Sequence, residues 1–567
     1  PWITLPFHAD GILIYPLQGQ YVRFEAEVGI DDASVNGSAY FSAMNIAPNL
    51  VIKELVNQYP HEMAMLSMAV ENMEKWIISP DASIERKAVE NVIEKLKNKV
   101  YYTDVAKQIA NEKDINVQIH KYLELLDKAQ EIYLIQEELA WLNVSAVQAA
   151  FDDMKKQTGY DINKYEPLLK ELFRLEKKGF QGIYSGEEQA IADARKALKY
   201  KHKILLGNTL LDTNKIVAAR FKLGMTARQA MAPDLGTQAN NWSNQESARR
   251  GGFDAEIVEL SDLREDIKTR CIYKPSNGSS ISDRKLHWEG DRVMFSQLQS
   301  DKRWNIFEAK LDGTDCKPLL ENEEPDLEFY DGTYLPDGRI VAVSNIGYQG
   351  VPCVNGSDAV GNMVLYNPKD KSMRRLTFDQ DANWNPTIMN NGRIMYTRWE
   401  YTDLTHYYSR IVMHMNPDGT ENKALYGSGS MFPNSTFDMQ PLPGYGSAFI
   451  GIISGHHGIA RSGRLILFDP TKGRKGVSGM IQEIPHRNRP IQELIKDELV
   501  NDVWPQFIKP TPLSDKYFLV AAKLTPNSLW GIYLVDIYDN VTCLMQAEGE
   551  GYISPILVRK TMTPPAI

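Results

Sequence analysis

A recurring pattern of tight turns between short strands is the feature that most constrains how this chain folds. From about Asn214 onward helical periodicity disappears, and β-rich runs such as 340–343 and 517–520 take its place. Asp, Asn, Gly and Pro at the turns supply tight-turn chemistry. One kind of turn follows an opening strand, at 289–292, 336–339, 390–393 and 514–516. A second kind follows a later strand, at 311–314, 367–370, 416–419, 469–472 and 538–540.

This turn pattern predicts a β-propeller over residues 206–567. The unit of strands and turns repeats about every 48 to 70 residues, as four-stranded propeller blades do. Five blades are clear from the sequence. A sixth would combine the runs 215–219 and 255–258 with the final strand 556–558, which would tie the two ends of the ring together. Six blades is therefore the prediction, with seven as the alternative.

The regions before the propeller have a different character, so we expect a multidomain protein. Residues 46–205 show apolar residues at helical spacing, with Glu and Lys at i, i+4 on the polar faces, and predict an α-helical bundle. Residues 1–45 alternate in the manner of strands, and the run 21–28 places Val22 and Phe24 on one face and Tyr21 and Arg23 on the other. This segment is predicted to belong to a β-sandwich.

Composition and cysteine spacing exclude several functional classes. The formal net charge of −10 argues against a nucleic-acid partner, which would need a basic surface stripe. No apolar run reaches the length of a membrane span. The four cysteines stand far apart and form neither CxxC nor CxxCH, so a zinc knuckle or a covalently attached haem of that type has no support.

Propeller connectivity predicts which face of the disc carries the functional loops. Turns that join strands one–two and three–four of a blade share one face, and the tight turns are all of this kind. Two–three connections and passages between blades share the other face, which is where the long loops fall. Because binding and catalysis concentrate on long loops held by a rigid scaffold, we expect the site there. The loops in question are 345–361, 399–406, 454–461, 379–384, 438–441 and 502–505.

The loop-rich face collects side chains suited to a ligand site. Glycines on both sides of His456 and His457 allow the backbone to expose the imidazoles or to wrap a ligand. The predicted catalytic residues, as imidazole bases and acid/base carboxylates, are His456, His457, Glu400 and Asp403. The predicted substrate-binding residues, for sugar stacking and for a uronate carboxylate, are Trp384, Trp399, Tyr401, Trp504, Arg398 and Arg461. A divalent metal ion is a candidate cofactor, and its candidate ligands are His406, His456, His457 and Gln349.

Structural roles compete with these functional ones. Trp384 and Trp504 are equally well explained as packing wedges between blades. Asp331, Asp381 and Asp502 are more simply explained as residues that cap strand ends by accepting bonds from backbone N–H groups. Cys353 is better explained as a small buried hydrophobe than as a nucleophile. The sequence leaves these alternatives open.

A resemblance to a known family becomes specific within the propeller. The motifs that carry it are DGTYLPDGR (331–339), YQGVPC (348–353), LTFDQD (376–381), RWEYTD (398–403), MNPDGT (415–420) and SGHHG (454–458). Over roughly residues 205–560 the chain resembles the middle propeller domain of the hydrazine synthase alpha subunit, and more closely haem-free relatives of it. The turn repeats also resemble the TolB-type propeller. Because this sequence has no CxxCH, the resemblance implies the fold, without haem and without nitrogen chemistry.

A second resemblance concerns the N-terminal segment. Residues 8–41, with YVRF (21–24) and VGIDD (28–32), look like the middle of the NPCBM module, a carbohydrate-binding β-sandwich. This resemblance implies an exported, glycan-related protein, periplasmic or extracellular, and we expect any export signal to precede Pro1.

Two functional hypotheses follow. The first is a carbohydrate-active enzyme, either a polysaccharide lyase or a glycoside hydrolase, that binds a glycan or oligosaccharide on the loop-rich face. The second is a non-catalytic propeller that captures a glycan or a protein partner, with the helices as a spacer. We favour the enzyme. Redox catalysis with haem fails because the ligating motifs are missing.

Overall fold

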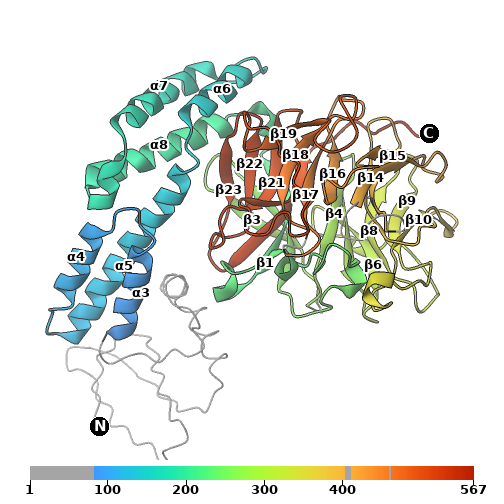
Figure 1. Cartoon of the computed structure of the whole chain (residues 1–567), viewed down its shortest axis with the longest axis horizontal. Helices are drawn as coiled ribbons and strands as arrows, with labels where there is room; N and C mark the ends of the chain where they lie inside the picture. The colour runs from blue at the N-terminus through green and yellow to red at the C-terminus, as the bar shows by residue number, and fades with distance from the viewer. Residues whose placement is uncertain (1–81, 277, 402–409, 459–460) are drawn as a thin grey trace, which may run out of the picture. The chain divides into compact units, whose positions relative to one another are not determined.

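The computed structural model describes residues 82–567, except 277, 402–409 and 459–460 (Figure 1). The predicted β-sandwich segment at 1–45 and the start of the predicted helical region therefore lie outside the described residues. None of the described helices combines the length and the apolar character needed to cross a lipid bilayer.

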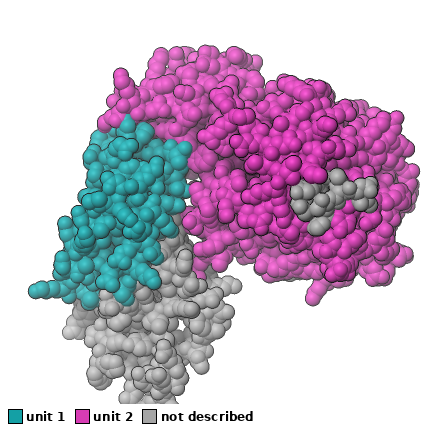
Figure 2. All heavy atoms as spheres, in the orientation of Figure 1, with its two compact units in different colours: residues 1–140, 179–195 teal, residues 141–178, 196–567 magenta. Residues whose placement is uncertain are grey.

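The chain divides into two compact units, shown in different colours in Figure 2. Unit 1 comprises Pro1–Ala140 and Gly179–Arg195, and unit 2 comprises Trp141–Lys178 and Lys196–Ile567. Part of the predicted helical region thus belongs to the same compact unit as the sheets. The described α-helices are α3 (Ser83–Ile93), α4 (Val100–Ile109), α5 (Ile115–Leu139), α6 (Val144–Met154), α7 (Ile162–Lys178) and α8 (Glu188–Leu206).

In unit 1, α3, α4 and α5 pack against one another through apolar side chains. Polar groups inside this packing are paired. The Tyr102 hydroxyl donates to the Ile183 carbonyl at 3.0 Å. The Gln136 amide accepts from the Lys97 N–H at 3.0 Å and donates to the Lys95 carbonyl at 3.2 Å, which satisfies backbone groups beyond the end of α3.

In unit 2, α6 begins at an N-cap and lies against the last sheet. The Asn143 side chain accepts from the Ala146 N–H at 3.0 Å, as expected for a favourable cap. Asp153 at the end of α6 forms an ion pair with Lys516 at 2.6 Å. Asn540 donates to the Ala146 carbonyl at 3.0 Å. The helix is therefore fixed to the turns that join strands of this sheet.

Most of unit 2 is antiparallel sheet built from consecutive groups of four strands (Figure 1). The first sheet contains β24 (Glu550–Leu557), β1 (Lys215–Lys222), β2 (Ala255–Ser261) and β3 (Lys268–Tyr273), in that order. The second contains β4 (Ser282–Leu286), β5 (Arg292–Leu298), β6 (Trp304–Lys310) and β7 (Lys317–Pro318). The third contains β8 (Phe329–Tyr334), β9 (Ile340–Ser344), β10 (Asn362–Asn367) and β11 (Ser372–Arg375).

The remaining strands continue this pattern. An eight-stranded sheet contains β12 (Asn383–Ile388), β13 (Ile394–Trp399), β14 (Arg410–Met415), β15 (Lys423–Tyr426), β16 (Ser435–Pro441), β17 (Phe449–Ser454), β18 (Arg464–Phe468) and β19 (Met480–Ile484). Its two halves, β12–β15 and β16–β19, are joined by the single parallel pairing of Arg410 with Ser435. The last sheet contains β20 (Gln506–Pro512), β21 (Tyr517–Lys523), β22 (Gly531–Asp536) and β23 (Val541–Met545).

The inner strands, which we define as β4, β8, β12, β16, β20 and β24, form a closed ring. Each contacts the next in this order, and β24 contacts β4. A ring of four-stranded antiparallel groups around an axis is the architecture of a β-propeller. The predicted closing strand is confirmed, because β24 pairs with β1 with Ile556 opposite Val217.

Apolar side chains between neighbouring groups of strands form the propeller core. One such cluster joins Met294 and Ile306 of the second sheet to Phe329 and Ile340 of the third, all at most 2% exposed. Close packing of this kind supplies most of the stability of a sheet stack. The tight turns lie where the sequence placed them: Gly338, with φ of 89°, follows Asp337 in the turn between β8 and β9.

One large feature of the fold was not predicted. Residues 223–254, between β1 and β2, form a long two–three connection with short 3₁₀ helices. Its contacts reach several other sheets of unit 2: Trp530 donates to the Ala230 carbonyl at 3.0 Å, and Trp384 donates to the Asn244 side chain at 2.5 Å. We call residues 223–254 the crossing loop.

Candidate functional site

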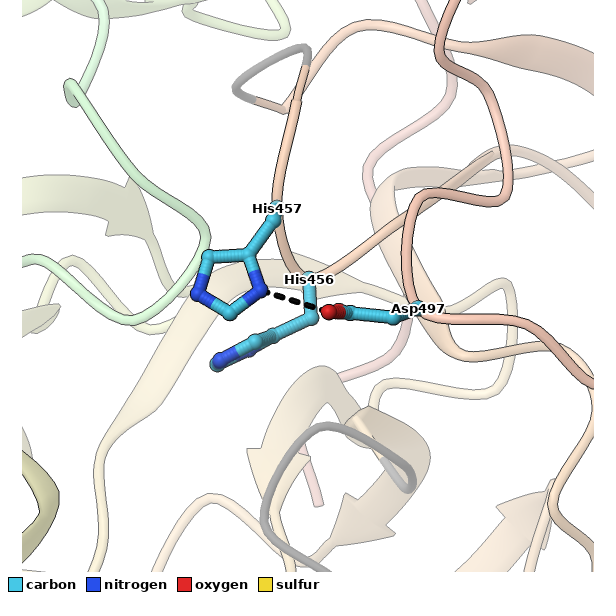
Figure 3. A group of neighbouring side chains, drawn as sticks. All are labelled: His456, His457 and Asp497. Carbon is cyan, nitrogen blue, oxygen red and sulfur yellow. Dashed lines mark hydrogen bonds and ion pairs between the residues drawn. The ribbon is translucent and has the colours of Figure 1, made fainter.

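A pair of histidines and an aspartate form the candidate site on the loop-rich face (Figure 3). His456 and His457 follow β17, in the connection to β18, and Asp497 lies in the long passage between β19 and β20. Arg410 at the start of β14 and Trp242 of the crossing loop complete the surroundings. Sequence reasoning found the two histidines but missed Asp497, Arg410 and Trp242, because nothing in the sequence indicates which passages meet.

A glycine allows the two segments of the site to approach closely. The His456 N–H donates to the Asp497 carbonyl at 2.9 Å, which joins the histidine loop to the passage. A Cβ at Gly455 would lie 2.8 Å from the Asp497 carbonyl oxygen and 2.8 Å from the Leu499 nitrogen. Both are backbone atoms, so any larger side chain at Gly455 would force the segments apart.

His457 and Asp497 form a hydrogen-bonded dyad. Nδ1 of His457 lies 2.6 Å from Oδ2 of Asp497, and the two side chains are 50% and 39% exposed. A carboxylate accepts at this position, so Nδ1 carries the proton and Nε2 keeps its lone pair. Figure 3 shows the second ring nitrogen on the side away from Asp497. His457 is thereby held as an accessible base or ligand.

His456 is held in the opposite tautomer. The Arg410 guanidinium donates to Nδ1 of His456 at 2.8 Å, so Nδ1 supplies the lone pair and Nε2 carries the proton. His456 is 5% exposed, and its ring centroid lies 4.3 Å from that of His457. Trp242 packs against both imidazoles, at centroid distances of 4.8 and 5.5 Å. The pair therefore combines one basic nitrogen with one N–H donor.

The same cluster has the composition of a metal site, but its hydrogen bonds do not suit one. Ligand atoms of His456, His457 and Asp497 all lie within 4.8 Å of one another. However, Arg410 occupies the lone pair of His456 and adds a positive charge beside it. A cation bound by all three residues would have to displace Arg410, so we assign no step of the chemistry to a metal.

A buried layer of tryptophan and arginine lies close to the pair. Arg410 lies over Trp399 at 4.4 Å, and Arg461 lies over Trp384 at 4.7 Å. The two indoles stack at 6.1 Å, and each is 1% exposed. Their faces are thus covered by protein, which agrees with the packing alternative for Trp384. Arg461 is 4% exposed and donates to the Ser243 carbonyl at 2.7 Å.

The comparisons with known proteins concern the fold. No protein-family model matches the sequence, and no curated protein matches it. Among solved structures, hydrazine synthase from Kuenenia stuttgartiensis aligns with 12% identity and a TM-score of 0.46 over 62% of this chain and 48% of that chain. TolB from Acinetobacter baumannii aligns with 9% identity and a TM-score of 0.35 over 64% of this chain and 72% of that chain. An oligogalacturonate lyase in complex with manganese aligns with 10% identity and a TM-score of 0.32 over 56% of this chain and 90% of that chain.

This chain therefore spans about half the length of the hydrazine synthase chain. The neighbours include TolB-like propellers of low identity. The propeller assignment rests on the strand order and on the ring of inner-strand contacts. Our sequence shows no CxxCH motif, and the segment that resembles the NPCBM module lies outside the described residues.

The other predicted site residues occupy different surroundings. Glu400 lies 3.2 Å from Arg398, which also forms an ion pair with Asp379 at 3.0 Å. Tyr401 is half-buried against Trp399, with ring centroids 5.8 Å apart. Glu400 is thus held by Arg398 and Tyr401 packs against Trp399, on the same face as the histidine pair.

Four further predicted residues lie in loops of the chain or outside its described part. Trp504 is half-buried in the passage before β20, and Gln349 is exposed in the loop between β9 and β10. Asp403 and His406 lie outside the described residues, so their roles stay predictions.

Asp381 is a buried carboxyl near the pair that the sequence assigned only a structural role. It is 2% exposed, and its Oδ1 has no hydrogen-bond partner among the described residues. Burial raises the pKa of Asp381 to about 6, and the positive charge of Arg410 opposes that rise. Arg410 therefore interacts with Asp381 through its charge as well as with His456 through a hydrogen bond.

Proposed function

We propose that the protein is an exported carbohydrate-active enzyme, built on a six-bladed TolB-like propeller, that cleaves an acidic glycan by β-elimination. The observation that carries this proposal is the 2.6 Å hydrogen bond between Asp497 and Nδ1 of His457, which leaves Nε2 of a half-exposed imidazole as a base. A lyase needs one such base, whereas a glycoside hydrolase needs a pair of carboxyl groups. Glu400 is engaged by Arg398, which disfavours the hydrolase.

In the proposed reaction, Nε2 of His457 removes the proton from the sugar carbon next to the carboxylate. The electron pair of that C–H bond forms a carbon–carbon double bond, and the neighbouring C–O glycosidic bond breaks. The protonated His457 returns its proton to the leaving oxygen, so atoms and charges balance. Asp497 orients the ring and stabilises the imidazolium form. Arg410 contributes positive potential beside the site, which favours an anionic substrate.

The second candidate is a non-catalytic propeller that binds a glycan or a protein partner. The observation that favours it is the burial of Trp384 and Trp399, each 1% exposed, which removes two of the predicted sugar-stacking surfaces. In that case the histidine pair contributes hydrogen bonds and contact area only.

The experiment that separates the two is an assay for unsaturated uronate. The purified chain is incubated with a panel of acidic and neutral polysaccharides, and the ultraviolet absorbance of the 4,5-unsaturated product is followed. We expect turnover on an acidic member of the panel, and a loss of about 10² to 10⁴ in rate for His457→Ala. His120→Ala, which alters an exposed histidine of α5, is the matched control and should keep full rate.

Binding measurements complete the design. If a polysaccharide of the panel binds but no unsaturated product forms, the binding hypothesis replaces the lyase. Elemental analysis of the same preparation checks the metal: a stoichiometric divalent ion lost in His456→Ala would show that the cluster binds a metal in spite of Arg410.

A further inference from the structure

A large cavity lies on the propeller axis and opens on the face opposite to the histidine pair. Its volume is about 980 Å³, and residues from every inner strand line it. The turns that follow these strands, including residues 443–447, form its mouth. This is the face that carries the tight turns, where sequence reasoning expected no site. The volume falls within the range of small-molecule pockets.

The floor of the cavity is a ring of equivalent residues, one from each inner strand. All adopt a left-handed backbone at a β-bulge, with φ between 51° and 54°, and they are Asp283, Asp331, Asn385, Asp438, Lys509 and Ser554. The pairing register shifts at these positions, for example between Tyr330 and Thr333 in β8. A bulge of this kind turns a side chain away from the regular pleat, and here it turns toward the axis.

Hydrogen bonds and ion pairs link most members of the floor ring. The Asn385 N–H donates to Asp331 Oδ2 at 2.6 Å, the Asp438 N–H to Asn385 Oδ1 at 3.3 Å, and the Lys509 N–H to Asp438 Oδ2 at 3.1 Å. The Lys509 ammonium pairs with Asp438 at 2.8 Å and reaches Asp283 at 3.3 Å. One ammonium group is thus shared between two of the three floor carboxylates.

A second ring lies two residues further along each inner strand, toward the mouth. Its members that line the cavity are Lys285, Thr333, Thr387, Gln440, Thr511 and Ile556. It contains one ammonium group, three hydroxyls and one amide, and no carboxylate. The Lys285 ammonium group forms no ion pair or side-chain hydrogen bond with a described residue, although it stands in a cavity wall. Burial lowers the pKa of Lys285, and the charges of the floor carboxylates oppose that change. An ammonium group in such a place is costly unless an anion accompanies it.

The charge of the lining has the opposite sign to that of the chain. Five cationic side chains line the cavity, Arg284, Lys285, Lys509, Arg559 and Lys560, against the three floor carboxylates. The formal net charge of the whole chain is −10. A concave surface with an excess of positive charge concentrates anions. Lys560 is paired with Glu289 outside the lining at 2.8 Å, so the lining keeps a formal excess of one positive charge over its carboxylates.

Aromatic groups stand at the mouth beside these cations. Trp288 and Tyr334 lie with ring centroids 6.3 Å apart, and Tyr445 is 49% exposed at the opposite side of the mouth. The segment after β24 forms one wall, where the Thr561 N–H donates to the Trp288 carbonyl at 2.8 Å. Aromatic faces beside hydroxyl and amide groups suit a ligand that has both C–H faces and hydroxyls.

We propose that the axial cavity is a second binding site, for a small hydroxylated carboxylic acid of the sugar-acid class, with Lys285 as the counter-ion of the carboxylate. The hydroxyls of Thr333, Thr387 and Thr511 and the Gln440 amide hydrogen-bond the ligand's hydroxyl groups. Lys285 is the one ammonium of the second ring, and the guanidinium groups of Arg284 and Arg559 donate to Ser554 and to the Leu513 carbonyl. This arrangement matches a monoanion better than a phosphate dianion. This inference does not rest on the proposed lyase activity.

Calorimetric titration of the full chain tests the proposal, with galacturonate as probe and with galactose and inorganic phosphate as comparison ligands. We expect galacturonate to bind at least about tenfold more tightly than either comparison ligand. Lys285→Met, which keeps the length of the side chain, should weaken binding about tenfold, and Thr387→Val should weaken it without changing the shape of the wall. Lys472→Met, at an exposed turn, is the matched control and should bind as the unaltered chain does.

A variant at the histidine site distinguishes binding in the axial cavity from binding at the histidine pair. His457→Ala should bind galacturonate in the axial cavity with unchanged affinity, whatever its effect on turnover. A labelling experiment needs no variant: galacturonate, but not galactose, should protect Lys285 from acylation by a small amine reagent, read by mass spectrometry. The proposal is overturned by absence of galacturonate binding, by equal binding in Lys285→Met, by loss of binding in His457→Ala, or by unprotected Lys285.

Discussion

The guanidinium of Arg410 lies 2.8 Å from Nδ1 of His456 and so determines what the histidine pair can bind. It removes the lone pair that a cation would need and places a positive charge beside the site. The same contact orients the His456 ring against Trp242. In the proposed function, Arg410 therefore favours acid–base chemistry on an anionic substrate over metal coordination.

Replacing this arginine should convert the cluster into a metal site. In Arg410→Met the Nδ1 lone pair of His456 becomes available, and the cluster with His457 and Asp497 gains a third ligand. We expect affinity for Co²⁺ or Zn²⁺ to rise at least about tenfold over the unaltered chain. Titration with Co²⁺, followed by its visible absorption, measures this. Equal affinity in the two proteins would show that Arg410 does not control the site, and Arg487→Met, at an exposed arginine, serves as control.

Asp331 should make the stability of the propeller depend on pH. Burial, together with the charge of Asp283, raises the pKa of Asp331 to about 7, against an ordinary value of 3.8. Between these values the folded chain holds a proton that the unfolded chain has lost, so stability falls as pH rises from about 4 to 7. Asp331→Asn lacks this loss, and Lys509 keeps Asp283 and Asp438 as partners.

The expected result is that Asp331→Asn matches the unaltered chain near pH 4 and exceeds it at pH 8, by an amount on the order of 1 kcal/mol. Urea unfolding at the two pH values measures the difference. Asp337→Asn is a control of opposite sign: although burial opposes it, hydrogen bonds from Arg339 lower the pKa of Asp337. That variant should lose stability at pH 8. A gain at pH 4 as large as at pH 8 for Asp331→Asn would contradict the electrostatic explanation.

Gly455 should be intolerant of a single added methyl group. In Gly455→Ala the Cβ would meet two backbone atoms, at Asp497 and Leu499, each at 2.8 Å. We expect a loss of about 1 to 3 kcal/mol in the free energy of unfolding, because backbone cannot yield as a flexible side chain does. Gly446→Ala is the matched control, since a Cβ there has no neighbour within 4 Å. Thermal unfolding of both variants tests this prediction. Equal melting temperatures would show that the backbone near Gly455 can accommodate the added methyl group.

Much of the propeller follows from local sequence chemistry. Turn residues such as Asp337 and Gly338 fix where strands end, and the run at 556–558 was correctly paired with the run at 215–219. Strand count and connectivity then place His456 and His457 on the loop-rich face. These features were predictable because each depends on a few neighbouring residues or on a fixed topological rule.

The rest depends on contacts between distant segments. Asp497 and Arg410 meet the histidines only because two passages approach each other at Gly455. The floor ring of the cavity was missed for a different reason. The sequence pattern predicts a loop of the loop-rich face at 438–441, which is wrong, because these residues belong to the inner strand β16. It gives Asp331 a strand-end role, because the ring appears only when the bulges of all inner strands are aligned on one axis. Their bulged backbone conformation leaves no mark in the sequence pattern.

The pairing of β24 with β1 has a consequence for biosynthesis. The first-made strand of the ring waits with an open hydrogen-bonding edge until residues 550–557 have left the ribosome. During that interval the nascent chain exposes a template to which any passing strand could add. We therefore expect the nascent chain to be most exposed to strand addition by other chains before the last strand pairs with β1.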